Sequence, residues 1–371
     1  MAWITKEPNG RYKVGYRTPD GRIRARRFDR KVDADRFAAA VETDKNRGEW
    51  VDPQLGKRTL SQWVDEWWPT IVNLAPSSRE RLRGVLDHDV LPRFGKVPIA
   101  RITHTGVATW VADLQRAGLA PATVHKCHQV LSRVLAAAVR AGLLQRNVTA
   151  DVELPRIRSQ EMRFITPEQI TALADAHPER YRVFVLIAAY GGFRFAELAG
   201  LRRHRVDLAG RVRVEETCVE VKGTLHWGPP KTDAGRRTVA LPPFVVRALR
   251  EHERQWSQPE LSGLVFTAPE SGPLRRSNFR HKVWLPAVRA VGLDGLRIHD
   301  LRHTAVALWI AAGANLLEVK RRAGHERSSF TMDRYGHLFP NADEDLARRL
   351  DELGCQDSPK RPGDNVEDLG A

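Results

Sequence analysis

Cysteine and long apolar runs are both scarce in this chain of 371 residues. Its three cysteines, Cys127, Cys218 and Cys355, are odd in number and far apart, which excludes a disulfide framework and a CxxC metal site. The longest apolar runs, such as Val183 to Tyr190, fall well short of the ~20 residues that cross a bilayer. The opening residues MAWITKEPNG lack a signal-peptide core. We therefore expect a reduced cytoplasmic protein without a zinc site.

Positive charge is what the sequence has in excess. Sixty Lys and Arg residues against 45 Asp and Glu give a net charge of +15 and an isoelectric point near 10.2. A hydrophobic content of 42% excludes a largely disordered polycation, and the length predicts two or three domains. Nucleic acid is the commonest partner for such a field, so we expect a nucleic-acid partner, with an anionic membrane surface as the alternative.

Residues 1–55 read as a small sheet followed by one helix. Extended runs around Trp3, Tyr12 to Tyr16 and Ile23 to Phe28 are separated by Asn9-Gly10 and Asp20-Gly21, which is typical of a β-meander. Nine basic and two acidic residues lie between positions 11 and 31. Such strands can enter a DNA groove, although a solvated face is the alternative. The candidate DNA-binding residues are Arg11, Lys13, Arg22, Arg24, Arg26 and Arg27.

The rest of the chain predicts a multidomain α+β protein. Apolar residues at helical spacing predict an all-helical domain over 58–152, with its tryptophans in the core. Residues 160–353 mix helical periodicity with the extended runs RVRVEETCVEV and RRTVAL, which predicts a mainly helical domain with a small antiparallel sheet. The polar tail 354–371 is expected to be disordered.

Four segments of the third domain carry residues suited to chemistry on an anion. Two glycines end one helix before Arg194, which is expected in the first turn of the next helix, where backbone N–H groups favour an anion. Glu197, one turn later, can hold its guanidinium, although a plain surface ion pair is the alternative. Lys231 lies on a basic turn between two strands, where it can donate a proton or remain solvated.

The other two segments carry histidine, arginine and tyrosine. His299 and Arg302 are three apart on one helix face and can meet the same ligand, whereas we assign His303 a structural role. His325 follows a glycine, and Tyr335 lies ten residues later. A buried structural histidine and a core tyrosine are the alternatives when each segment is taken alone.

The ordered set Arg, Lys, His-x-x-Arg, Gly-His and Tyr resembles the tyrosine recombinase family, the phage-integrase type of site-specific DNA recombinase. The segment DHDVLPRFGKVPIARIT resembles that family's core-site-binding domain, and the basic meander resembles the arm-site-binding domain of phage integrases. The resemblance covers roughly residues 1–350. It implies that the catalytic residues are Arg194, Lys231, His299, Arg302, His325 and Tyr335, with Tyr335 as the nucleophile.

These residue types suit attack on a phosphodiester. Two permanent guanidinium charges stabilise the added negative charge at phosphorus, and His325 adds a hydrogen bond. His299 is the expected base for the tyrosine, while Lys231 is the expected acid for the departing 5′ oxygen. The product is a 3′-phosphotyrosyl link that a second strand can reseal without ATP. We expect no metal and no cofactor.

The resemblance also implies the partners. They are double-stranded core-type and arm-type attachment sites, a homotetramer on DNA, and possible accessory factors, namely a DNA-bending protein and an excision factor. The expected function is integration of a phage or mobile element, at the nucleoid in the cytoplasm of a bacterial host and with no membrane partner. The alternatives are a transposon-borne recombinase, a chromosome-dimer resolvase, a type IB topoisomerase, or a DNA-binding protein without catalysis.

Overall fold

The structure is a computed structural model of the full chain. It describes residues 2–17, 21, 23–46, 57–157, 162–207, 209–339, 347–348, 350–352 and 354. The chain divides into two compact units, residues 1–159 and 160–371, which we treat separately. The predicted tail 354–371 lies outside the described residues except for Gly354.

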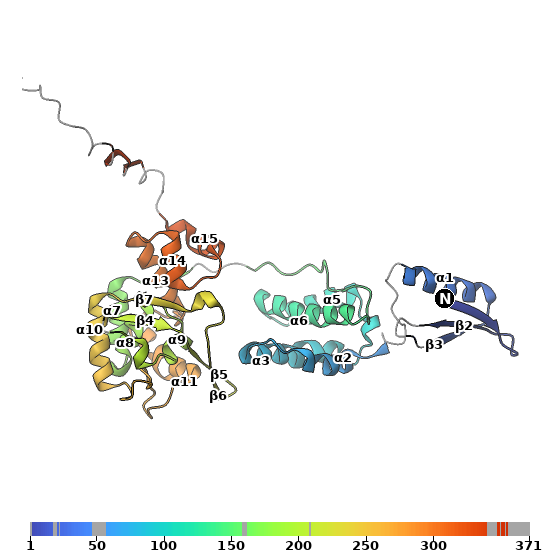
Figure 1. Ribbon diagram of the computed structural model, residues 1–371, viewed down its shortest axis with the longest axis horizontal. Coiled ribbons are helices and arrows are strands. Elements are labelled where there is room, and N and C mark those ends of the chain that lie inside the picture. Colours follow the sequence, from blue (N-terminus) through green and yellow to red (C-terminus); the bar gives the residue numbers. More distant parts are fainter. Residues whose placement is uncertain are drawn as a thin grey trace, which may run out of the picture. The chain divides into compact units, whose positions relative to one another are not determined.

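The described residues from Ala2 to Asn46 form an antiparallel sheet with one helix packed on it (Figure 1). Strands β1 (Ala2–Lys6), β2 (Tyr12–Arg17) and β3 (Ile23–Phe28) pair in the order β1-β2-β3, and helix α1 (Lys31–Asn46) follows. Aromatic rings of Tyr16 and Phe28 pack on Phe37 of α1, which shows which face of the sheet the helix covers. The predicted meander and helix are confirmed.

The remainder of the first unit is helical, as predicted. Leu60, Trp63, Val64 and Trp67 line the buried face of the first helix of this region, and Trp63 donates a hydrogen bond to the carbonyl of Val134 at 3.1 Å. Buried tryptophans confirm that these side chains belong to the core. The helices are α2 (Leu60–Trp67), α3 (Pro76–Val85), α4 (Leu91–Phe94), α5 (His104–Arg116) and α6 (Pro121–Arg140), with a π-helical turn joining α3 to α4.

The second unit is built around one buried helix. Helix α8 (Glu179–Gly191) packs against its neighbours with nine buried residues, because its sequence is apolar on all sides. The predicted capping box of Thr166 and Gln169 opens the preceding helix. The other helices of this unit are α7 (Pro167–Asp175), α9 (Phe195–Ala199), α10 (Pro243–Gln255), α11 (Arg276–Phe279), α12 (Leu285–Ala290), α13 (Asp300–Ala311), α14 (Leu316–Ala323) and α15 (Ser328–Tyr335).

The strands of this unit form two small antiparallel ladders instead of one sheet. Strand β4 (Arg211–Val214) pairs with β7 (Arg237–Ala240), whereas β5 (Thr217–Val221) pairs with β6 (Thr224–Gly228). The turn that carries Lys231 therefore joins strands of different ladders and is not a hairpin. None of the described helices is long and apolar enough to cross a membrane.

Candidate active site

Arg194 is held at the start of α9 by Glu197. Gly192 ends α8 with φ of 66°, a left-handed conformation that glycine adopts without strain. Arg194 is the N-cap residue of α9 rather than part of its first turn. Its backbone N–H and its Nη1 atom both donate to the Glu197 carboxylate, at 2.9 and 2.8 Å. The predicted contact between these two side chains is confirmed.

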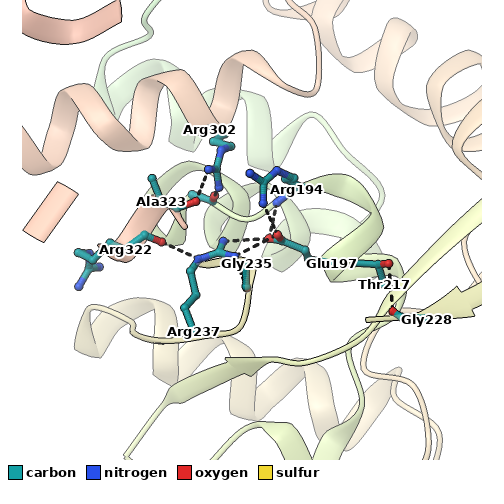
Figure 2. A network of polar contacts seen from close by, with 10 residues as sticks. Arg194, Glu197, Thr217, Gly228, Gly235, Arg237, Arg302, Arg322 and Ala323 are labelled. Atoms are coloured by element: carbon teal, nitrogen blue, oxygen red, sulfur yellow. Dashed lines mark hydrogen bonds and ion pairs between the residues drawn. The ribbon is translucent and has the colours of Figure 1, made fainter. Parts of the chain in front are cut away.

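The Glu197 carboxylate also accepts hydrogen bonds from a second arginine, which the sequence analysis did not identify as its partner. Arg237 of β7 donates through Nη1 and Nη2 to both carboxylate oxygens, at 3.0 and 2.9 Å, and its Nε donates to the carbonyl of Arg322 at 2.7 Å. Figure 2 shows Arg194, Arg237 and Arg302 around Glu197. Burial alone would raise the pKa of Glu197, but the contacts with Arg237 and the charge of Arg194 outweigh it and bring that pKa to about 2.

Arg302 lies beside this cluster, at the top of Figure 2, and its hydrogen bonds link the ends of two helices. Its Nη1 atom donates to the carbonyl of Gly192 at 2.6 Å, and its Nη2 atom donates to the carbonyl of Ala323 at the end of α14. The side chain is buried, and this burial, with the charges of Arg194 and Arg237, lowers its pKa to about 9. Two guanidiniums therefore bind the Glu197 carboxylate, and the charge of a third, that of Arg302, also acts on it. One carboxylate against three guanidiniums leaves an excess of two positive charges at this point.

Burial and the same positive charges lower the pKa values of two of the predicted histidines. Desolvation, followed by the charges of His303, Arg302 and Arg194, lowers the pKa of His299 to about 4. Desolvation and the arginine charges lower the pKa of His325 to about 3. Both rings are therefore neutral near pH 7. His325 Nδ1 lies 2.9 Å from the hydroxyl of Thr331, which fixes its ring orientation.

Gly324 allows the His325 segment to approach the strand that carries Arg237. A Cβ atom at Gly324 would lie 2.7 Å from the carbonyl oxygen of Ala234 and 3.1 Å from Cδ of Arg237, and its φ is 64°. A side chain would therefore force α14 away from the β7 segment. Glycine is thus required before His325 for steric reasons, in addition to the chemical role predicted for the histidine.

Tyr335 is the last residue of α15 and points into the protein. It is 1% exposed, and its ring stacks on that of His325 with centroids 6.4 Å apart. Its hydroxyl lies 2.6 Å from Nδ1 of His303. Burial raises the pKa of Tyr335, and the charges of Arg302 and Arg334 oppose this change. His303, to which the sequence analysis assigns a structural role, is thus the residue whose side chain meets the tyrosine hydroxyl.

Lys231 is the predicted site residue that the structure does not bring into this cluster. It is exposed on the segment between β6 and β7, and it forms no ion pair within the described part of the chain. Arg237, six residues later in the chain, does not take the exposed position of Lys231, because its guanidinium is buried against Glu197. The other five predicted residues, together with Glu197, meet around α9, α13 and the end of α15.

A basic groove of about 900 Å³ opens beside His325. Its lining joins the edge of β7 to α14 and contains no acidic side chain. The basic residues among those that line it are Arg211, Arg236, Arg237, Lys320, Arg321 and Arg322. This groove extends the positive field of the cluster across the surface of the second unit.

The predicted basic residues of the N-terminal sheet fall on different faces. Since side chains alternate along a strand and Phe28 faces α1, Arg24 and Arg26 also lie on the helix-covered side. Arg26 stacks on the rings of Phe28 and Phe37. Lys13 and Arg27 pair in register on the open face. Arg11 forms an ion pair with Asp29 at 2.8 Å, and Arg22 lies outside the described residues.

The two residues that sequence reasoning missed carried weak signals. His303 lies four residues after His299, so both rings occupy one helix face, and their centroids are 5.0 Å apart. Arg237 alternates with the apolar Val239 in β7, so strand periodicity places its side chain on the buried face. In both cases the periodicity was readable, but the partner lay far away in sequence.

Comparisons with known proteins agree with the predicted family. The phage integrase family model matches residues 163–342, and the phage integrase central domain model matches residues 58–155. The putative prophage phiRv2 integrase of Mycobacterium tuberculosis is 28% identical over 357 residues, which cover 93% of each chain.

Solved structures share the fold. The Tn1549 transposon integrase in complex with a circular intermediate DNA matches with a TM-score of 0.67 and 18% identity, over 80% of this chain and 99% of that one. The lambda integrase tetramer bound to a Holliday junction matches with a TM-score of 0.56 and 16% identity, over 88% and 96%. The multidomain α+β fold with small antiparallel sheets is confirmed.

Proposed function

The chain belongs to the phage integrase family of tyrosine recombinases, and from this premise we propose which of its residues carry the reaction and which DNA they meet. The protein is a site-specific recombinase that cleaves and rejoins DNA. We assign the chemistry to Arg194, Lys231, His299, Arg302, His325 and Tyr335. The observation that carries this assignment is the excess positive charge around Glu197, with the Tyr335 hydroxyl buried beside Arg302.

The arginine cluster is the proposed binding site of the scissile phosphate. Arg194 keeps one nitrogen on Glu197 and has a side chain 40% exposed, so its other N–H groups can donate to a non-bridging oxygen. Arg302 gives both terminal nitrogens to carbonyls and therefore contributes mainly charge. His325, neutral near pH 7, can donate one further hydrogen bond without adding charge.

Tyr335 attacks phosphorus, so that a bond forms between its oxygen and the 3′ phosphate while the bond to the 5′ oxygen breaks. The departing oxygen needs a proton, and Lys231 lies on an exposed segment from which its ammonium can reach bound DNA. The phosphotyrosyl ester retains the energy of the original bond. A second 5′-hydroxyl can therefore reverse the step and seal a new strand without a nucleotide cofactor.

A covalent adduct is the direct test of this function. The DNA substrate is a duplex selected by the full chain from a random-sequence pool and nicked beside the cleavage position, so that the short 5′ fragment diffuses away. We expect a band on a denaturing gel that carries both protein and DNA and that resists boiling in detergent. Specific DNA binding without any such band would contradict the proposed reaction.

Arg194→Ala is expected to slow adduct formation by roughly 10²–10³-fold, because removing one preorganised donor to a developing oxyanion costs about that much. DNA affinity should remain nearly unchanged, since many other cations contact the backbone. Arg182→Ala is the matched control, because the Arg182 side chain is also 40% exposed and is paired with one carboxylate, that of Asp175. A wild-type rate in Arg194→Ala would remove this residue from the site.

The N-terminal sheet is the proposed reader of arm-type DNA, through the face that α1 leaves open. Trp3 lies on that face over Gly15, where a Cβ would come within 2.4 Å of the indole. Lys13 and Arg27 flank it, and Arg27 is paired with Glu7 at 2.8 Å. A three-stranded ribbon with exposed cations and an apolar ring suits the major groove.

Lys13→Ala is expected to weaken arm-site binding and to lower by about one the number of counterions released on binding, which the salt dependence of the affinity reports. Lys6→Ala should do neither. The two changes remove the same charge from opposite faces of the sheet, since Lys6 pairs in register with Tyr12 on the helix side. Binding is measured with the full chain on arm-site DNA at several salt concentrations. Equal losses in both variants would contradict the open-face assignment.

The proposed assembly is a homotetramer on two DNA duplexes, by analogy with the lambda integrase tetramer bound to a Holliday junction. We further propose that a DNA-bending protein and an excision factor set the direction of the reaction. The proposed domain limits are 1–55, 58–152 and 160–353, followed by the tail 354–371. The place of action is the nucleoid of a bacterial cytoplasm, where the element integrates.

A further inference from the structure

The polar contact made by the Tyr335 hydroxyl is with His303. Nδ1 of His303 lies 2.6 Å from the phenol oxygen, which is a short hydrogen bond. Both side chains are buried, at 5% and 1% exposure, and their ring centroids are 5.9 Å apart. Water is therefore excluded from the phenol, and the neighbouring imidazole is the group placed to take its proton.

His303 is held in the form that can accept a proton. Burial lowers its pKa, and the charges of Arg334, Arg297 and Arg302 act in the same direction, while Asp300 opposes them. The neutral ring can carry its proton on Nε2 and leave Nδ1 as the acceptor. The titratable and charged groups that face it are Arg297 before α13, His299 at the N-cap of α13, Asp300 and Arg302 on α13, His325 after α14, and Arg334 and Tyr335 on α15.

We propose that His303 is a catalytic residue whose Nδ1 atom accepts the Tyr335 proton as the phenol oxygen attacks phosphorus. The phenol oxygen gains the bond to phosphorus, the 5′ oxygen leaves with a proton from Lys231, and the phenol proton remains on His303. When the strand is rejoined, the incoming 5′-hydroxyl returns a proton to Lys231, and the departing phenolate takes its proton back from His303. This inference rests on the proposed function, in which Tyr335 is the nucleophile.

His299, which the sequence analysis selects as the base, takes a different position in this scheme. Its ring meets that of His303 edge to face, with centroids 5.0 Å apart. His299 thus contacts the ring of His303, and His303 in turn contacts the phenol. His299 remains able to donate to the DNA phosphate from its place at the start of α13.

The test is the pH dependence of adduct formation by the full chain on a nicked attachment-site duplex. His303→Asn places an amide near the position of Nδ1, so a hydrogen bond is kept but no proton can be taken. We expect cleavage near pH 7 to fall by roughly 10²–10⁴-fold, which is the usual contribution of a general base. The remaining rate should rise about tenfold per pH unit, because only the ionised phenol reacts. The wild-type rate should be nearly flat over the same range.

His337→Asn is the matched control, since His337 is an exposed histidine two residues after the nucleophile. It should keep the wild-type rate and pH profile. A second measurement replaces Tyr335 with a fluorinated tyrosine, whose phenol is more acidic. This replacement should restore much of the lost rate in His303→Asn, whereas a merely structural role would give no rescue.

Two outcomes overturn the inference: a His303→Asn rate equal to that of the wild type, or a loss that is equal at every pH and is not rescued by the acidic phenol. DNA affinity and melting temperature are measured on the same samples, and His303→Gln serves in its place if His303→Asn does not fold. Adduct formation that persists in Tyr335→Phe would instead contradict the proposed function. The two failures are therefore distinguishable.

Discussion

Tyr335→Phe is expected to bind attachment-site DNA as the wild type does and to form no covalent adduct with it. The change removes one oxygen, which is the atom that attacks phosphorus, and leaves the ring in place against His325. The remaining cations are untouched, so the electrostatic contribution to DNA affinity is preserved. The measurement is a binding titration followed by the adduct gel on the same DNA.

Tyr335→Phe should lose all cleavage activity but only a small part of its free energy of unfolding. The hydrogen bond to Nδ1 of His303 is lost, and a buried acceptor left without a partner costs about 1–3 kcal/mol. Tyr190→Phe is the matched control, because Tyr190 is a tyrosine of the same unit whose ring packs on Phe244. It should keep full adduct formation. An adduct in Tyr335→Phe would show that another side chain is the nucleophile.

Features set by neighbouring residues were predictable from the sequence. The strands of residues 2–28 alternate and are separated by turns, and Gly10 and Gly21 adopt φ of 81° and 84° there. The capping boxes at Thr59 and Thr166 likewise depend on residues three apart. The contact between Arg194 and Glu197 belongs to the same class, since it spans one turn of helix.

Features set by distant residues were not predictable in this way. The extended runs in the sequence do not indicate which strands pair. Strand β4 pairs with β7, although the β5–β6 hairpin lies between them in the chain. The partner of the Tyr335 hydroxyl is 32 positions away, and the partner of Arg237 is 40 positions away. Alternation places Arg237 on a buried face, but only tertiary packing brings the Glu197 carboxylate to it. The family pattern predicts which residues are catalytic, but it does not predict these contacts.

Arg237→Ala is expected to lower the free energy of unfolding by about 3–5 kcal/mol, because it leaves the buried carboxylate of Glu197 without its two-pronged partner. The carbonyl of Arg322 loses its donor as well. Arg236→Ala is the matched control, since it removes an exposed arginine from the neighbouring position. It should unfold as the wild type does in a urea titration. A loss in Arg237→Ala no greater than that of the control would contradict the role of this ion pair.

A double change separates the structural role of the pair from its catalytic role. Replacing both charges with apolar side chains, in Glu197→Leu with Arg237→Met, removes the unpaired buried charge, and such replacements are often neutral for stability. We therefore expect most of the lost stability to return. Cleavage should stay slow, because Arg194 no longer has the carboxylate that orients its guanidinium. Recovery of both stability and cleavage would mean that Arg194 needs no such support, and the pair would then serve folding alone.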